Sequence, residues 1–155
     1  MNLVSVPPAV DPAVSARMSN TRGRDTAAEM AVRRKLHRMG LRYRVNLRPV
    51  PGFRRTADIV FTKQRIAVLI DGCFWHACPD HYRPATGSRS RFWADKIEGN
   101  RRRDRESSEM FRAAGWLVLR FWEHEDPAAV ADQVASAVHE AVCRTTSQAS
   151  ESPCT

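Results

Sequence analysis

A loop dense in metal-binding side chains follows the most apolar short stretch of the chain, and it constrains the fold more than any other segment. Residues 66–70 are apolar and rich in β-branched side chains, and Gly72 follows closely, which predicts a buried strand. The next residues, 71–81, hold two thiols, two imidazoles and two large aromatic rings. Such a loop at the end of a buried strand predicts a sheet with a functional site at its edge, as in α/β folds.

Three side chains in this loop have the spacing of metal ligands. Cys73 and Cys78 are separated by four residues, and His81 follows Cys78 after two more. The four cysteines of the chain could instead pair as disulfides. In a reducing compartment, however, a close thiol pair interleaved with histidines favours a metal. Thiolate and imidazole donors suit zinc, which takes four ligands in structural sites, so we expect a fourth ligand.

The charge of the chain limits the partners that it can have. The 25 Lys and Arg residues exceed the 17 Asp and Glu residues, and the net charge of +8 favours a nucleic acid. No apolar run approaches the roughly 20 residues of a membrane span, and the first residues lack the pattern of a secretion signal. We therefore expect a cytoplasmic monomer without membrane association.

With 155 residues the chain has single-domain length. We assign residues 1–15 to a flexible arm, 16–142 to the folded domain and 143–155 to a disordered tail.

Hydrophobic periodicity and capping signals predict the remaining elements. Thr26 begins a capping box that opens a helix ending near Gly40. A long helix, interrupted or bent near Gly99, is predicted at residues 90–114, and a last helix at residues 128–142. Strands are predicted at residues 41–47, 57–61, 66–70 and 116–122. This order predicts an α/β fold in which helices flank one mixed sheet.

Three carboxylates lie where a hard cation could bind. Glu29 is at the edge of the apolar stripe of the first helix, Asp58 is at the start of a strand, and Asp71 is at the end of the next. Glu29 and Asp58 could also have purely structural roles, since Glu29 can cap its own helix and Asp58 can cap a turn. Carboxylates at the ends of adjacent strands would nevertheless form the oxygen-rich kind of site that magnesium takes.

A basic run on the long helix is a candidate for contact with nucleic acid. Arg101, Arg102 and Arg103 are consecutive, and Arg105 follows. Such a run is most often a solvated helix face. In a chain this basic it is also a candidate for contacts with phosphates.

These motifs, in this order, resemble the very-short-patch repair (Vsr) mismatch endonucleases, a branch of the restriction-endonuclease-like PD-(D/E)XK nucleases. The resemblance runs from about residue 15 to 140 and is most specific in Gly-Cys-Phe-Trp-His at 72–76 and Trp-Glu-His at 122–124. Like the family, the chain lacks the (D/E)-x-K pair of other nucleases of this fold. The other matching segments are Arg-Met-Ser at 17–19, Arg-Asp-Thr-Ala-Ala-Glu at 24–29, Asp-Ile-Val at 58–60, Phe-Trp-Ala-Asp-Lys-Ile at 92–97, Asn-Arg-Arg-Arg-Asp at 100–104 and Gly-Trp-Leu-Val-Leu-Arg at 115–120.

The resemblance implies a structural zinc site that connects the loop to the last strand. Taking His76 as a ligand would crowd all four donors into one short loop, whereas a ligand from the last strand leaves His76 free. The implied zinc ligands are Cys73, Cys78, His81 and His124.

The resemblance also implies a catalytic magnesium site. Asp58 would bind the ion together with the main-chain carbonyl of Ile70. His76 and Glu29 would orient the attacking water and the phosphate. An imidazole can trade a proton near neutral pH, and no lysine is placed to do so here.

Recognition of DNA would rest on aromatic side chains. In the family, residues that match Phe74, Trp75 and Trp93 form a wedge that enters the major groove beside a T:G mismatch, and the match to Met18 enters the minor groove. Without the family, Phe74 and Trp75 would be assigned to the core, although two adjacent aromatics at this junction cannot both face inward. Unstacking is cheapest at a mismatch, so insertion itself selects mispairs.

The expected function is therefore magnesium-dependent nicking of double-stranded DNA, 5′ to the T of a T:G mismatch formed by deamination of 5-methylcytosine. A cytosine-5 DNA methyltransferase and a repair polymerase are its expected functional partners. One alternative is a related restriction or defence nuclease without mismatch preference. Another is a zinc-stabilised DNA-binding module without catalysis.

Overall fold

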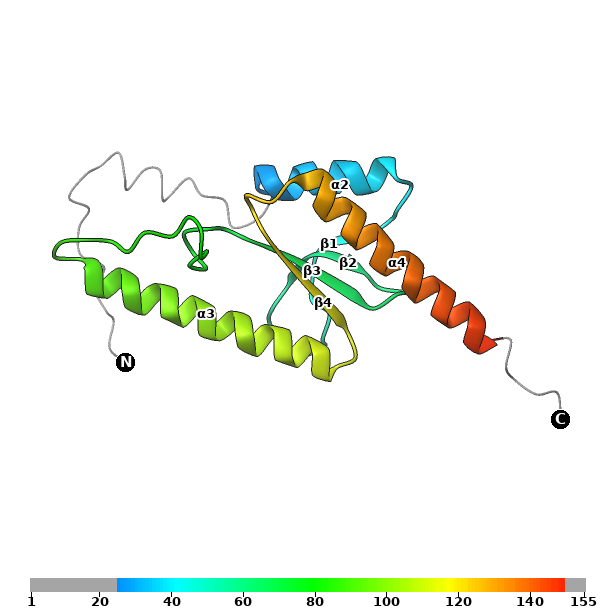
Figure 1. Cartoon of the computed structure of the whole chain (residues 1–155). Helices are drawn as coiled ribbons and strands as arrows, with labels where there is room; N and C mark the ends of the chain where they lie inside the picture. The colour runs from blue at the N-terminus through cyan, green and yellow to red at the C-terminus, as the bar shows by residue number, and fades with distance from the viewer. Residues whose placement is uncertain (1–24, 150–155) are drawn as a thin grey trace.

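A four-stranded mixed sheet with helices on both faces forms the body of the protein (Figure 1). The computed structural model describes residues 25–149. In chain order its elements are α2 (Ala27–Arg38), β1 (Arg44–Leu47), β2 (Ala57–Phe61), β3 (Ile66–Asp71), α3 (Ser90–Ala113), β4 (Leu117–Trp122) and α4 (Pro127–Ala149). The predicted class, an α/β fold with a mixed sheet flanked by helices, is confirmed.

The strands lie in the order β1-β2-β3-β4. The first three are antiparallel neighbours, whereas β3 and β4 are parallel. A parallel pair needs a crossover between its strands, and α3 provides it. In Figure 1, α3 lies on one side of the sheet, and α2 and α4 lie on the other. The parallel pair therefore brings the ends of β3 and β4 to the same edge of the sheet, beside the loop that follows Asp71.

Alternating side chains of the strands fill one apolar layer on each face. On β3, Ile66 and Val68 pack with α2 and α4, and Ala67 packs on the opposite face with Phe111 of α3. This alternation is the two-residue period of a strand whose faces are both covered. Among the described residues, no helix combines the length and apolar character that crossing a bilayer would require.

The helix α3 differs from its prediction because it continues through Gly99 without an interruption. A glycine inside a helix costs about 1 kcal/mol relative to alanine. Burial of Ile97 and Phe111 on either side of it anchors the helix to the body of the protein, and Nε of Arg103 donates to the Gly99 carbonyl at 3.0 Å. The predicted end is correct: at Gly115, with φ of 84°, the chain turns into β4.

The helix α4 is longer than predicted, because residues 143–149, which we expected to be a disordered tail, continue it to Ala149. Thr145, Thr146 and Ser147 donate their hydroxyls to carbonyls four residues earlier, at 2.9, 3.0 and 3.1 Å. Polar residues that favour loops in isolation are thereby accommodated within the helix. The first strand is shorter than predicted and begins at Arg44.

Candidate functional site

The loop after β3 is fastened to the end of β4 by Glu123. The Cys73 N–H donates to Oε1 of Glu123 at 2.7 Å, and the Glu123 N–H donates to the Asp71 carbonyl at 2.9 Å. These bonds hold residues 72–81 over the edge where β3 and β4 end. Two clusters of polar side chains lie there, one on the loop and one beneath it.

The first cluster brings together the four predicted zinc ligands. Their donor atoms lie within 4.8 Å of one another, and the separations between Sγ and Nδ1 atoms range from 3.1 to 3.8 Å. A tetrahedral zinc with Zn–S of about 2.3 Å and Zn–N of about 2.0 Å separates its ligands by about 3.5 Å, so the spacing suits that ion. The four residues are Cys73, Cys78, His81 and His124.

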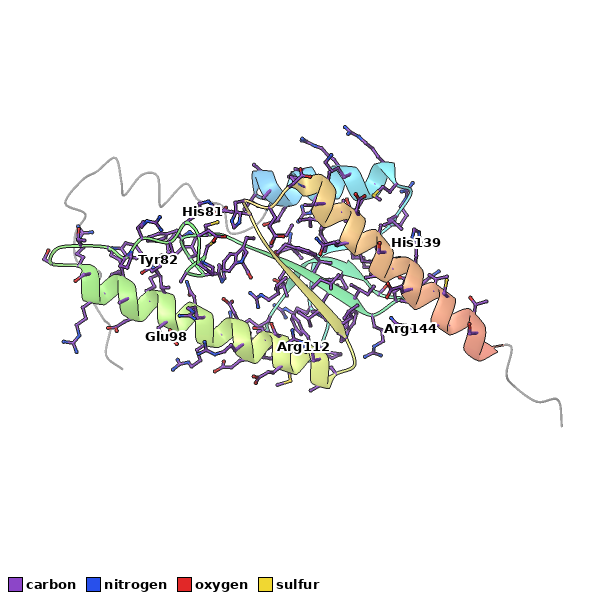
Figure 2. The ribbon with its side chains drawn as sticks, viewed as in Figure 1. His81, Tyr82, Glu98, Arg112, His139 and Arg144 are labelled. Carbon is purple, nitrogen blue, oxygen red and sulfur yellow. The ribbon has the colours of Figure 1, made fainter. Side chains whose placement is uncertain are left out.

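The surroundings of this cluster also favour a cation. Burial, together with the neighbouring Cys78 and Glu123, raises the pKa of the Cys73 thiol to about 11. Nε2 of His124 lies 3.7 Å from a carboxylate oxygen of Asp80, a partner of the kind that orients metal-bound histidines. Figure 2 shows His81 in the loop above α3, next to Tyr82. His76 is not part of this cluster.

A separate carboxylate site, beside these two clusters, is centred on Asp58 at the start of β2. Its Oδ2 accepts a hydrogen bond of 2.7 Å from the main-chain N–H of Ile70 on β3. The pKa of Asp58 is raised to about 6, chiefly by burial and also by the charges of Glu29 and Asp71, which together outweigh the lowering effects of the Ile70 hydrogen bond and of the Arg33 charge. An ionised Asp58 is therefore costly in this environment unless a cation balances it.

Glu29 combines the two roles that its position allowed. It closes the capping box, because its main-chain N–H donates to Oγ1 of Thr26 at 3.3 Å and its Oε2 accepts from the Asp25 N–H at 2.9 Å. Its side chain is only 2% exposed and also lines the cleft beside Asp58. Nη2 of Arg33 donates to Oε2 of Glu29 at 3.0 Å, so a guanidinium already balances this carboxylate.

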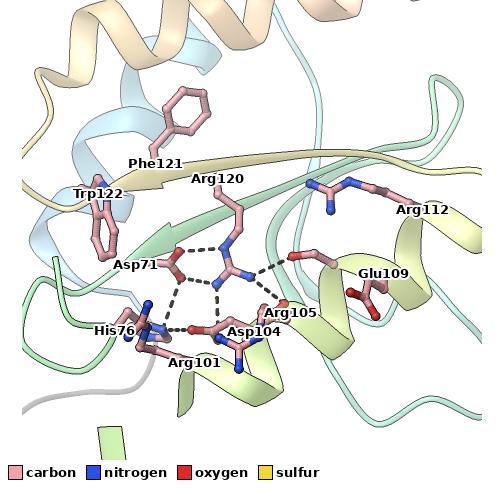
Figure 3. Close-up of a pocket in the computed structure, with 11 residues that line it drawn as sticks. Asp71, His76, Arg101, Asp104, Arg105, Glu109, Arg112, Arg120, Phe121 and Trp122 are labelled. Atoms are coloured by element: carbon pink, nitrogen blue, oxygen red, sulfur yellow. Dashed lines mark hydrogen bonds and ion pairs between the residues drawn. The ribbon is translucent and has the colours of Figure 1, made fainter. Parts of the chain in front are cut away.

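A connected network joins His76 to the sheet (Figure 3). Nδ1 of His76 lies 2.5 Å from Oδ2 of Asp104 on α3 and 3.7 Å from Oδ1 of Asp71. Arg120 of β4 donates to both carboxylate oxygens of Asp71, and its Nη2 lies 3.3 Å from Oδ1 of Asp104. Nη1 of Arg120 also donates to Oγ of Ser108 at 3.0 Å.

The network shifts the pKa values of His76 and Asp104. Burial alone would lower the pKa of His76, but the hydrogen bond to Asp104 and the charges of Asp71 and Asp104 raise it overall. For Asp104, burial acts to raise the pKa, yet His76 and Arg120 lower it below its ordinary value. With Nδ1 held by Asp104, Nε2 is the ring nitrogen of His76 that remains for a substrate.

The residues of this network line two neighbouring cavities. A cleft of about 700 Å³ lies between α2, the end of β3 and α3, and a cavity of about 400 Å³ lies between α3 and β4. Asp71, His76, Asp104 and Arg120 line both cavities. The cleft also contains the predicted residues Glu29, Asp58, Ile70, Trp75 and Arg103.

Aromatic side chains cluster beside the cleft. The ring of Phe74 lies 5.2 Å from that of Trp75 and 5.6 Å from that of Trp93, and Trp75 and Trp93 are 6.0 Å apart. None of the three is fully buried, so they do not belong to the core. Nζ of Lys96 lies 5.5 Å from the rings of both tryptophans.

The arginines of the basic run of α3 have different partners. Arg101 and Arg102 are exposed and pair with Glu98 at 3.6 Å and Glu106 at 3.8 Å. Arg103 bonds the Gly99 carbonyl and reaches the cleft. Met18 lies outside the described residues.

The sequence analysis did not identify three charged residues of the site, although a sequence pattern points to each of them. Arg120 is a cation in the otherwise apolar strand at residues 117–122, a position that requires a partner. Arg33 follows Glu29 by one helical turn, and Asp104 follows Asn100 by one turn, so each pair shares a helix face.

The sequence is similar to those of several known proteins. The family model "DNA mismatch endonuclease Vsr" matches residues 10–82. The chain is 44% identical over 126 residues to the type II nicking enzyme V.NaeI of Lentzea aerocolonigenes, a match that covers 80% of this chain and 74% of the relative. It is 38% identical over 108 residues to V.XorIIP of Xanthomonas oryzae pv. oryzae, covering 70% and 77%. It is 35% identical over 100 residues to the DNA mismatch endonuclease Vsr of Escherichia coli, covering 64% and 62%.

Proposed function

The chain belongs to the Vsr family of DNA endonucleases, and from this premise we propose that it nicks duplex DNA 5′ to the T of a T:G mismatch. The mismatch would arise by deamination of 5-methylcytosine, which a cytosine-5 DNA methyltransferase makes. The reaction would leave a 5′-phosphate and a 3′-hydroxyl, and a repair polymerase extends such a 3′ end. The sheet would be a restriction-endonuclease-like core in which His76 takes the place of the usual lysine.

One observation carries this proposal: a carboxylate cleft and a cluster of half-exposed aromatic rings share a wall. Trp75 lines the cleft that contains Asp58 and His76, and it also contacts the rings of Phe74 and Trp93. A base step held by the rings would therefore place its phosphate near the cleft. A zinc-stabilised binding module would have no use for a buried carboxylate with a raised pKa at this position.

The cleft suits one hard cation at Asp58. Arg33 balances Glu29 and Arg120 balances Asp71, whereas within residues 25–149 the side chain of Asp58 has no ion pair, and its hydrogen bond comes from the main chain of Ile70. Asp58 and the carbonyl of Ile70 would hold magnesium, which when bound neutralises charge at the scissile phosphate.

His76 would move the proton that hydrolysis requires. Water attacks phosphorus, the bond from phosphorus to the 3′ oxygen breaks, and that oxygen takes up a proton. Asp104 holds Nδ1 of His76 and thereby orients Nε2 to exchange a proton with the water or the leaving oxygen. Glu29, fixed by Arg33, would orient the water from the opposite wall.

The thiol and imidazole cluster would hold a structural zinc. Three ligands come from the loop and His124 follows β4. The ion would fasten the loop that carries the aromatic rings and His76 to the sheet.

The substrate preference separates this proposal from its alternative. Several relatives are named type II nicking enzymes, a name that does not state a mismatch. We would compare nicking of matched duplexes with that of an otherwise identical T:G duplex, each with and without magnesium. Nicking of the T-containing strand of the T:G duplex alone, and only with magnesium, is expected. Equal nicking of matched DNA would favour a nuclease without mismatch preference, and the absence of nicking would favour a binding module.

A further inference from the structure

The positive charge of the chain is concentrated in one segment that contains no carboxylate. Residues 30–57 contain nine Lys and Arg residues and no Asp or Glu. The rest of the chain holds the other 16 Lys and Arg residues and all 17 Asp and Glu residues, so it is close to neutral. This segment comprises most of α2, the edge strand β1 and the connection to β2.

Most cations of this segment are exposed and form no ion pair with a carboxylate of the described residues. Within residues 25–149, Arg33 is the one member of the segment that forms an ion pair; the others have no carboxylate within reach. Three exposed arginines of α3 differ, because Arg101, Arg102 and Arg105 pair with Glu98 and Glu106 on their own helix. The potential of the protein is therefore more positive along α2 and β1 than along α3.

Three arginines, one in β1 and one on either side of it, form a row that leads away from the cleft: Arg42, Arg44 and Arg48. Leu47 pairs with Ala57, the neighbour of Asp58, and Arg44 pairs with Val60 further along. At about 3.3 Å per residue, the stretch from Arg42 to Arg48 spans at most about 20 Å, the length of about six base pairs. Arg55 lines the cleft itself and connects it to the row.

The neighbouring helix adds exposed cations near this row, although Arg42 and Arg44 line a different cavity from Arg34 and Arg38. A groove of about 340 Å³ between α2 and β1 is lined by Arg34, Arg38 and Tyr43 among others. We define the α2–β1 surface by its exposed cations Arg34, Arg38, Arg42, Arg44 and Arg48.

We propose that the α2–β1 surface binds the phosphates of duplex DNA that flanks the nicking site. This rests on the proposed function, because the cleft fixes where the DNA is cut and the surface fixes where one arm of the duplex runs. The proposal assigns the main electrostatic contact to α2 and β1 and a smaller one to the paired arginines of α3. An alternative role for these arginines is to prevent association between sheets, which charges on an edge strand oppose. In that case their removal would have no effect on DNA binding.

The test is the salt dependence of binding without magnesium, measured by fluorescence anisotropy on an uncut duplex of about 30 base pairs. Each phosphate contact contributes about 0.9 to the slope of log K against log salt. We expect Arg42→Gln and Arg44→Gln each to reduce the slope by about that amount. Arg144→Gln removes one cation from the far end of α4, away from the cleft (Figure 2), and should leave the slope unchanged.

Unchanged slopes for Arg42→Gln and Arg44→Gln would overturn the proposal, and so would a larger loss for Arg101→Gln and Arg102→Gln. Size-exclusion chromatography tests whether the charges instead prevent association between edge strands. If the variants self-associate and the slope of their DNA binding is unchanged, the proposal is also overturned. Because binding is measured without cleavage, a wild-type protein that failed to nick T:G DNA would count against the proposed function alone.

Discussion

Arg120 on β4 donates two hydrogen bonds to Asp71 on β3, from Nε to Oδ2 at 2.8 Å and from Nη2 to Oδ1 at 2.6 Å. Nη1 of the same guanidinium donates to the main-chain carbonyl of Asp104 at 3.1 Å. Asp104 in turn holds Nδ1 of His76. Arg120 thus fixes the residues that orient the imidazole, and we expect it to act on the reaction through His76.

A double-mutant cycle tests that relationship. Arg120→Lys keeps a charge but cannot form the paired bonds to Asp71, so we expect it to slow nicking. A positioned proton donor or acceptor is typically worth about 10² to 10⁴ in rate, which bounds the loss for Arg120→Lys and for His76→Ala. In the His76→Ala background, Arg120→Lys should cause little further loss of single-turnover rate. Fully additive losses in folded protein, checked by circular dichroism, would show that Arg120 acts independently.

Removal of a zinc ligand should cost both the metal and the fold. Cys73→Ser or His124→Ala should lose bound zinc, measured by mass spectrometry, and should unfold at a lower temperature because structural zinc contributes folding energy. Cys143→Ser, at an exposed thiol on α4, is the matched control and should keep both. His76→Ala should also keep the zinc. If His76→Ala lost the metal and His124→Ala kept it, the ligand assignment would be wrong.

The fold could be predicted from local signals where those signals were strong. The capping box at Thr26 and the apolar run at residues 66–70 predicted α2 and β3 closely. The predicted interruption at Gly99 was wrong because packing of Ile97 and Phe111 outweighs the low helix propensity of one glycine. The end of α4 was missed because its Thr and Ser side chains bond within the helix, which composition does not reveal.

The candidate site was predictable only in part, for a physical reason. The Cys and His spacing predicted three of the four donors that lie together, and the family resemblance implied the fourth, His124. Asp104 and Arg120 take part through contacts between α3 and β4, which sequence spacing does not report. That Asp71 is held by Arg120 was likewise not predictable, although its place at the strand end was.

Asp58 should make stability depend on pH when magnesium is absent. Its pKa is about 6 in the folded protein against an ordinary value of 3.8, so the ionised form is disfavoured by folding. The free energy of unfolding should therefore fall as the pH rises from about 4 through about 6. A difference of about two pKa units amounts to about 3 kcal/mol as an upper figure. Asp58→Asn should remove this loss and be more stable than wild type at pH 8 but not at pH 4, measured by urea unfolding. Equal stabilities at pH 8 would contradict the burial of an unbalanced charge.

The aromatic cluster should carry the preference for mispaired DNA. Stacking on exposed bases is worth about 1–3 kcal/mol per aromatic side chain. Trp75→Ala and Trp93→Ala should therefore lower the ratio of T:G to matched duplex binding by about one order of magnitude or more. Trp116→Ala, at the opposite end of β4 beside Arg65, is the control and should keep the ratio. If Trp75→Ala and Trp93→Ala unfold instead, these rings are structural.

The central claim is that Asp58 carries the chemistry and takes no part in the zinc site or in mismatch recognition. The most direct test is the single-turnover rate of nicking of a T:G duplex by Asp58→Asn in magnesium, with zinc content and duplex binding measured on the same samples. We predict a loss of orders of magnitude in rate, unchanged zinc, and binding without magnesium that is equal or slightly tighter, because one negative charge near the phosphates is gone. Asp132→Asn, at an exposed position on α4, should nick like the wild type. Nicking by Asp58→Asn at a rate near that of the wild type would contradict the account and remove the active site from this cleft.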